Sequence, residues 1–272
     1  MDAVERAEAA RRLREAYDSR IPIEPLSEKY GDLTPADAYE IQQIQIRERL
    51  AQGRTVLGHK VGLTSAAMQR QLGVDRPDYG VLLDDMCFGE HQPVDTARFL
   101  QPRVEPEVAF VLKRELRGPG VTAAQAAAAV DFVLPALEII DSRIADWRIT
   151  FTDTVGDNAS SGGLVLGGRP MPLSVVDLRL MGCLLHRNGA LVGSGAGGAV
   201  LETPLASLVW LANTLGAFGV SLEEGHVVLP GSITAAVPVR AGDCVTASFA
   251  GLGTVTVRFA QDGGEEVSGE RV

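Results

Sequence analysis

The chain has 272 residues, 46% of them hydrophobic and 22% charged, which supports a packed core in one large domain or in one main domain with a small helical addition. Its formal net charge of −10 and its lack of clustered Lys and Arg argue against a nucleic-acid partner. No apolar run reaches the roughly 18 residues of a membrane span, the charged N-terminal segment lacks the apolar core of a signal peptide, and the scattered cysteines indicate a reducing compartment, so we expect a cytoplasmic protein without membrane contact.

The N-terminal region favours helices. Apolar and Ala positions recur at helical spacing over residues 2–18. A second helix is predicted to begin after Thr34, because Thr34 is a good N-cap and Pro35 suits the first helical turn. Asp37, three residues after Thr34, can complete a capping box by accepting a hydrogen bond from the Thr34 N–H. We therefore predict an N-terminal helical cap over residues 1–53.

Short β-branched runs alternate with Gly-rich turns from Arg54 onward, which predicts a chain dominated by strands. Asn188 and Gly189 between two apolar runs predict a tight hairpin. Helices are expected at about residues 122–130 and 204–215. The strand candidates are residues 55–62, 107–113, 132–140, 163–166, 179–187, 226–229, 243–249 and 253–259.

Helices and strands do not alternate regularly, so a doubly wound parallel sheet is not expected. The pattern predicts the α+β class, with a mixed β-sandwich or β-roll that carries N-terminal and peripheral helices. Residues 54–260 are expected to form the catalytic mixed-β domain. Residues 261–272 are polar and Gly-rich and predict a flexible tail.

Two carboxylates flank Pro106 in the segment RVEPEVAFVL. Glu105 and Glu107 are two residues apart, so in a strand both side chains point to the same face. The repulsion between them falls if a cation lies between them, and carboxylate oxygens suit Mg²⁺ or Mn²⁺. The alternative is an edge strand on which both glutamates are solvated.

A third carboxylate, Glu138, lies in the almost wholly apolar run FVLPALEII, which predicts a strand buried on both faces. An ionised carboxylate in such a strand requires a partner or a metal ion, because burying it alone is very costly. A buried salt bridge with Arg143 or Arg148 would satisfy it equally well. Asp141 and Asp153 are further candidates, either as ligands or as groups that support the ligands.

The segment GHKVGLTS reads as a strand, a turn and the start of a helix. Lys60 lies in the strand among apolar neighbours, where a lysine must find an anion or lose its proton. A helix that opens at Thr64 or Ser65 offers free backbone N–H groups to a carboxylate. Lys60 and this helix start are therefore candidates for holding a small organic acid. The alternative is a surface lysine on an edge strand.

Asp78 lies in a segment, residues 72–80, that is predicted to form a turn-rich loop and could fold over such a site. It is a candidate partner for Lys60 or a general acid or base, and a turn-forming aspartate is the structural alternative. The Gly-rich run at residues 193–198 lacks the Gly-Lys-Ser/Thr ending of a phosphate-binding loop, so nucleotide binding is not expected there.

Taken together, several segments in the same order resemble the 2-oxopent-4-enoate hydratase / 4-oxalocrotonate decarboxylase family, part of the fumarylacetoacetate hydrolase-like superfamily. The resemblance extends over roughly residues 5–260 and implies a mixed β-roll fold, an N-terminal helical portion and a symmetric homo-oligomer. The segments are GHKVGLTSAAMQ, GVDRPDYGVLLDDM, RVEPEVAFVL, LPALEIIDSRI, DTVGDNASSG and WLANTLGAFG.

The resemblance also implies site residues. It implies a Mg²⁺ or Mn²⁺ ion held by three glutamates, which match Glu105, Glu107 and Glu138. Lys60 and Asp78 match the family's polar pair near the substrate and are expected to be catalytic, while Thr64 and Ser160 are expected to bind the substrate. Pro106 departs from the family, whose members usually carry a small or aliphatic residue there. Since proline lacks an N–H and suits an edge or a bulge, the metal site should survive this change.

The activity that the resemblance implies is addition of water to a 2-hydroxy-2,4-dienoate, or to its 2-oxo-4-enoate form, to give a 4-hydroxy-2-oxo acid in aromatic meta-cleavage catabolism. The alternative is a 4-oxalocrotonate-type decarboxylase, since the segment GSITAAVPV looks more like that branch, whereas DSRIADWRITFTDTVGDNAS and residues 204–226 look more like the hydratase branch. A non-catalytic companion subunit is a third interpretation, and a decarboxylase of the same pathway is an expected partner.

Overall fold

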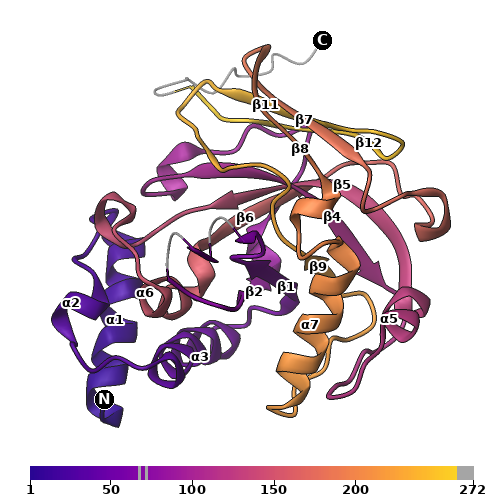
Figure 1. The fold of residues 1–272 in the computed structure, drawn as a ribbon. Helices are drawn as coiled ribbons and strands as arrows, with labels where there is room; N and C mark the ends of the chain where they lie inside the picture. Colours follow the sequence, from indigo (N-terminus) through magenta and orange to yellow (C-terminus); the bar gives the residue numbers. More distant parts are fainter. Residues whose placement is uncertain (67–68, 71–72, 262–272) are drawn as a thin grey trace.

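Two β-sheets carry most of the fold (Figure 1). The computed structural model describes residues 1–66, 69–70 and 73–261. The large sheet has the strand order β2-β1-β9-β4-β5-β6-β3, with β10 paired to β4, and the small sheet has the order β12-β11-β7-β8. Most neighbouring strands are antiparallel, whereas the pairs β1–β9 and β3–β6 are parallel.

The strands of the large sheet are β1 (Val56–Gly62), β2 (Asp78–Leu83), β3 (Cys87–Phe88), β4 (Arg103–Leu112), β5 (Val130–Ile140), β6 (Ser161–Leu166), β9 (Val227–Leu229) and β10 (Val237–Pro238). Those of the small sheet are β7 (Gly182–Arg187), β8 (Ala190–Ala196), β11 (Cys244–Phe249) and β12 (Gly253–Arg258). The α-helices are α1 (Ala3–Ser19), α2 (Leu26–Lys29), α3 (Pro35–Ala51), α5 (Ala123–Ala129), α6 (Phe151–Gly156) and α7 (Pro204–Gly216).

The large sheet curls until its two ends meet. Leu82 of β2 and Leu164 of β6 belong to one buried cluster, although β1, β9, β4 and β5 lie between them in the sheet. Asn158, just before β6, closes the remaining gap: the Val81 N–H donates to Asn158 Oδ1 (2.8 Å), and Asn158 Nδ2 donates to the Val81 carbonyl (2.9 Å). The result is a β-roll with an inner and an outer face.

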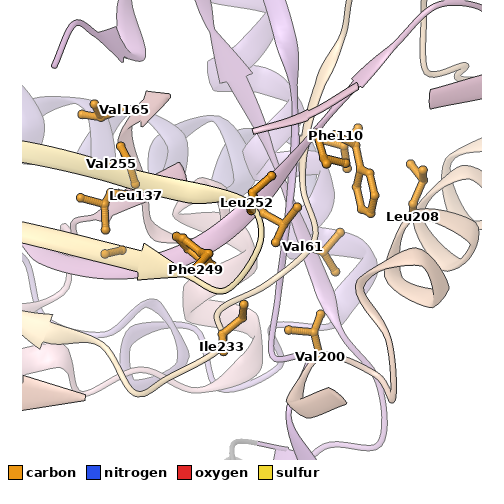
Figure 2. Packing of buried hydrophobic residues seen from close by; sticks show 14 of the residues in the cluster. Val61, Phe110, Leu137, Val165, Val200, Leu208, Ile233, Phe249, Leu252 and Val255 are labelled. Atoms are coloured by element: carbon orange, nitrogen blue, oxygen red, sulfur yellow. The ribbon is translucent and has the colours of Figure 1, made fainter. Parts of the chain in front are cut away.

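The outer face of the roll packs against the small sheet and against helices. Leu137 and Val165 of the large sheet lie beside Val255 of the small sheet, and Phe110 of β4 faces Leu208 of α7 (Figure 2). Side chains alternate between the two faces of a strand, so the neighbours of these residues point into the roll. The α+β prediction of a mixed sandwich or roll with peripheral helices is confirmed.

The N-terminal helices lie along one side of the roll (Figure 1). The predicted cap at Thr34 is confirmed, because its hydroxyl accepts from the Asp37 N–H and the Asp37 carboxylate accepts from Thr34. Ile46 of α3 packs against Val81 and Leu83 of β2, which joins this region to the main body. Among the described helices, none has both the length and the apolar character needed to cross a membrane.

Each predicted strand is present with somewhat different bounds, whereas β2, β3 and β10 are strands that the sequence analysis does not predict. The strand predicted at 107–113 begins earlier, at Arg103. The prediction that residues 72–80 form a loop is wrong at its end, because β2 begins at Asp78. All six residues of β2 are buried, so the polar–apolar alternation of a half-exposed strand is absent.

The boundaries predicted at residues 53 and 260 stay a prediction. Of the predicted tail, residues 262–272 lie outside the described residues.

Replacing Asn158 by Ala should lower the free energy of unfolding by about 2–4 kcal/mol, since it removes two hydrogen bonds and leaves the buried Val81 N–H and carbonyl without partners. Asn188→Ala is the matched control, because Asn188 also adopts a positive φ and bonds through its side chain, but is exposed. Urea denaturation measures both. Equal losses in the two variants would contradict the role given to Asn158 in closing the roll.

Candidate active site

Five ionisable side chains share the inner face of the roll. Strand pairing sets Glu105 of β4 directly opposite Glu138 of β5, and Gly62 of β1 opposite Asp78 of β2. Further along the same strands, the inner face is apolar and contributes to the cluster that closes the roll. The five residues are Lys60, Asp78, Glu105, Glu107 and Glu138.

Glu105, Glu107 and Glu138 come together as a carboxylate triad. Each offers one oxygen, and these oxygens all lie within 4.8 Å of one another. Glu107 is 1% exposed, Glu105 is partly buried, and β4 lies between β9 and β5, so the alternative of an edge strand with two solvated glutamates is wrong. The prediction that Glu105 and Glu107 point the same way is confirmed.

Several oxygens of the triad have no hydrogen-bond partner among the described residues. The Gly231 N–H donates to Glu107 Oε2 (2.8 Å), while Glu107 Oε1 and both oxygens of Glu138 have no hydrogen-bond partner among the described residues. Burial, together with the charge of Glu138, raises the pKa of Glu105 to about 7 and raises that of Glu107 well above its ordinary value. A divalent cation would relieve this repulsion and use the free oxygens, and three carboxylates are the ligands that Mg²⁺ and Mn²⁺ prefer. The residues therefore fit a divalent metal site.

Lys60 is buried in the middle of the sheet, between β2 and β9, so the surface-lysine alternative is wrong. Its Nζ lies 3.2 Å from Glu138 Oε1. Burial alone would lower the pKa of Lys60, but Glu138 and Asp78 outweigh burial and leave that pKa raised. Lys60 is therefore a fixed cation beside the triad.

The partners first considered for Glu138 lie elsewhere. Arg143 pairs with Asp157, and Arg148 pairs with two exposed glutamates of the N-terminal region, so a salt bridge from Glu138 to either arginine is wrong. Two aspartates also lie outside the triad. Asp141 accepts from the backbone N–H groups of Leu100 and Gln101, and Asp153 caps α6 and accepts from Ser27, so both support the fold.

Asp78 lies at the start of β2 and is 1% exposed. Burial raises its pKa; the nearby Lys60 and hydrogen bonds from Thr154 and the Gly62 N–H oppose this shift. Its Oδ1 has no hydrogen-bond partner among the described residues. A Cβ at Gly62 would collide with this carboxylate, so a glycine is needed where β1 passes β2.

Thr64 and Ser160 line the same cavity, of about 740 Å³, as Lys60, Asp78 and Glu105. Ser160 ends a run of three non-glycine residues with φ near +52°, a strained conformation that is often found at functional sites. The expected helix start near Thr64 agrees with helical backbone at residues 66 and 69–70, while residues 67–68 and 71–72 lie outside the described part.

Several cavity residues escape the sequence analysis. The hydroxyl oxygens of Thr154 in α6 and Ser160 lie 3.4 Å apart, and Trp147 lines the cavity. Gly231 contributes only its N–H, which no side-chain pattern reveals. The only sequence feature that points to Gly231 is the Pro230-Gly231 pair after a short apolar strand. This pair predicts a turn but does not indicate what the turn contacts.

Comparison with known proteins gives concordant results. The family described as fumarylacetoacetate hydrolase, C-terminal, matches residues 52–260. A 2-keto-4-pentenoate hydratase of Paraburkholderia xenovorans is 46% identical, over 95% of this chain and 96% of the relative. A 2-oxo-hept-4-ene-1,7-dioate hydratase of Escherichia coli is 42% identical, over 92% and 96%. The solved 4-oxalocrotonate decarboxylase of Pseudomonas putida G7, complexed with magnesium and adipate, superposes with a TM-score of 0.91 at 38% identity, over 95% of this chain and 98% of that chain.

Gly231→Ala should weaken Mn²⁺ binding about 10- to 100-fold, as is common for groups that orient a metal ligand. Gly231 has φ +124°, and a Cβ there would collide with Thr64, so the N–H that orients Glu107 must move. Gly225→Ala is the control, because Gly225 also has a positive φ (+81°) but has open space around it. Isothermal titration calorimetry compares the two; equal affinities would contradict the role of Gly231.

Proposed function

Because the chain belongs to the fumarylacetoacetate hydrolase family, we propose that it is a hydro-lyase that adds water to a 2-hydroxy-2,4-dienoate, or to its 2-oxo-4-enoate form, and releases a 4-hydroxy-2-oxo acid. The observation that carries this proposal is the buried carboxylate triad beside Lys60 in one cavity. Relatives that are 42–46% identical over nearly the whole chain are named as hydratases of such acids.

Glu105, Glu107 and Glu138 would hold a divalent cation, Mg²⁺ or Mn²⁺. The magnesium in the related decarboxylase supports a divalent metal. Such an ion, when bound, supplies a Lewis acid that stabilises negative charge on the oxygens of a 2-oxo acid. The Gly231 N–H keeps Glu107 oriented for this task.

Lys60 and Asp78 would act on the substrate itself. The fixed positive charge of Lys60 favours an anionic substrate oxygen beside the triad. Asp78 has an unpartnered oxygen in the same cavity, so it can accept or deliver the proton that moves between substrate oxygen and carbon. Thr64 and Ser160 would bind the substrate carboxylate through their hydroxyl groups.

The roll also excludes bulk water from this chemistry. Lys60, Asp78, Glu107 and Glu138 are all less than 5% exposed, so charges act on the substrate without competition from solvent. The water that adds to the substrate must then enter through the cavity.

A decarboxylase is the second candidate, because the related 4-oxalocrotonate decarboxylase has almost the same fold. Hydration is preferred because the hydratases are more similar in sequence. The deciding experiment incubates the purified protein and Mg²⁺ with 2-hydroxypenta-2,4-dienoate and, separately, with 4-oxalocrotonate. Formation of the 4-hydroxy-2-oxo acid supports the proposal; release of CO₂ without hydration would overturn it.

We further propose that the protein is cytoplasmic, forms a homo-oligomer and acts in aromatic catabolism. A decarboxylase of the same pathway is its proposed partner. A companion subunit without activity is less consistent with the site, since a scaffold has no use for a carboxylate triad with buried oxygens that lack hydrogen-bond partners.

Glu107→Gln should lower kcat by about 100-fold or more and weaken Mn²⁺ binding, because one anionic ligand is lost at nearly constant shape. The fold should be retained, as judged by circular dichroism. Glu40→Gln, on an exposed helix face, is the matched control and should behave like the unmodified protein. Unchanged turnover in Glu107→Gln would argue strongly against the site.

A further inference from the structure

A second cationic side chain besides Lys60, that of Arg103, lines the catalytic cavity. Arg103 is the first residue of β4. It lies two residues before Glu105, so both side chains point to the same face and their Cα atoms are about 7 Å apart. Within the described residues, no carboxylate lies within ion-pair distance of its guanidinium. The second arginine of the cavity, Arg148, differs in this respect because it pairs with Glu24 and Glu28.

The guanidinium of Arg103 is held on a rigid aromatic platform. Its Cζ lies 4.3 Å from the centre of the Trp147 ring, a cation–π arrangement. Trp147 Nε1 donates to the Gln101 carbonyl (3.1 Å), which fixes the ring. Asp146 and Trp147 both have φ near +55°, and strained non-glycine pairs of this kind persist where the surrounding structure holds a functional group in place.

The lining of the cavity beside this platform includes apolar side chains. Ile140 is the strand partner of Arg103, and Ile149 follows the strained turn; both line the cavity. A substrate whose 2-oxo acid end reaches the triad would therefore run its carbon chain along an apolar wall. Its far end would reach a planar cation with free N–H donors, a geometry that suits a carboxylate.

We propose that Arg103, stacked on Trp147, binds a second carboxylate at the far end of the substrate, so that the protein prefers dioic 2-hydroxydienoates to monocarboxylic ones. This inference rests on the proposed hydratase function. The competing explanation is that Arg103 only offsets the negative charge of Glu105. In that case its loss would change metal affinity and affect all substrates alike.

The test compares 2-hydroxyhepta-2,4-diene-1,7-dioate with 2-hydroxypenta-2,4-dienoate as substrates of the unmodified protein, Arg103→Met, Arg103→Lys and Arg148→Met. Loss of a charge-assisted contact predicts a fall of about 10- to 100-fold in kcat/KM for the diacid with Arg103→Met, mainly through KM, and less than about threefold for the monoacid. Arg103→Lys should recover part of the loss. Arg148→Met should keep the original ratio, because the charge of Arg148 is already paired.

The outcomes separate the two proposals. No preference of the unmodified protein for the diacid, or an equal fall for both substrates in Arg103→Met, would overturn the role of Arg103 while leaving hydration intact. A changed Mn²⁺ affinity of Arg103→Met in calorimetry, with equal losses for both acids, would support the charge-offset explanation instead. Hydration of neither acid by the unmodified protein would reject the proposed function itself.

Discussion

The repulsion among three neighbouring carboxylates, two of them buried and one partly buried, is the constraint around which this structure is organised. Glu105, Glu107 and Glu138 face one another inside the roll, where the burial of Glu107 and Glu138 limits screening by water. Lys60 contacts only Glu138 among them, and the Gly231 N–H contacts only Glu107. These two partners leave other carboxylate oxygens of the triad without a hydrogen bond. A divalent cation that contacts all three residues would therefore stabilise the triad most.

The fold creates this constraint and keeps it in place. Curling of the large sheet turns one face inward, and the Asn158 side chain bonds the edge of β2 where no further strand follows. Pro106 fits the same plan. It lies in β4 between the stretches that pair with β10 and with β9, so its missing N–H costs no ladder hydrogen bond on that side, while its carbonyl accepts from the Ile233 N–H.

Much of the site follows from local sequence, and the remainder depends on distant pairing. The shared direction of Glu105 and Glu107 follows from the two-residue period of a strand, and an apolar setting indicates that Glu138 is buried. The register that sets Glu138 opposite Glu105 cannot be read locally, because it depends on how two strands pair across the 17 intervening residues, 113–129, which include α5. Asp78 was misassigned to a loop for a related reason: a strand buried on both faces carries no alternation. Likewise, the stacking of Arg103 on Trp147 joins β4 to a turn whose backbone conformation no simple pattern predicts.

The most direct test of the triad is a crystal structure of the protein grown with Mn²⁺, with anomalous scattering recorded at the manganese edge. The account predicts one anomalous peak inside the roll, at about 2.2 Å from a carboxylate oxygen of each of Glu105, Glu107 and Glu138. A peak elsewhere, or a triad that closes on Lys60 alone at saturating Mn²⁺, would contradict it.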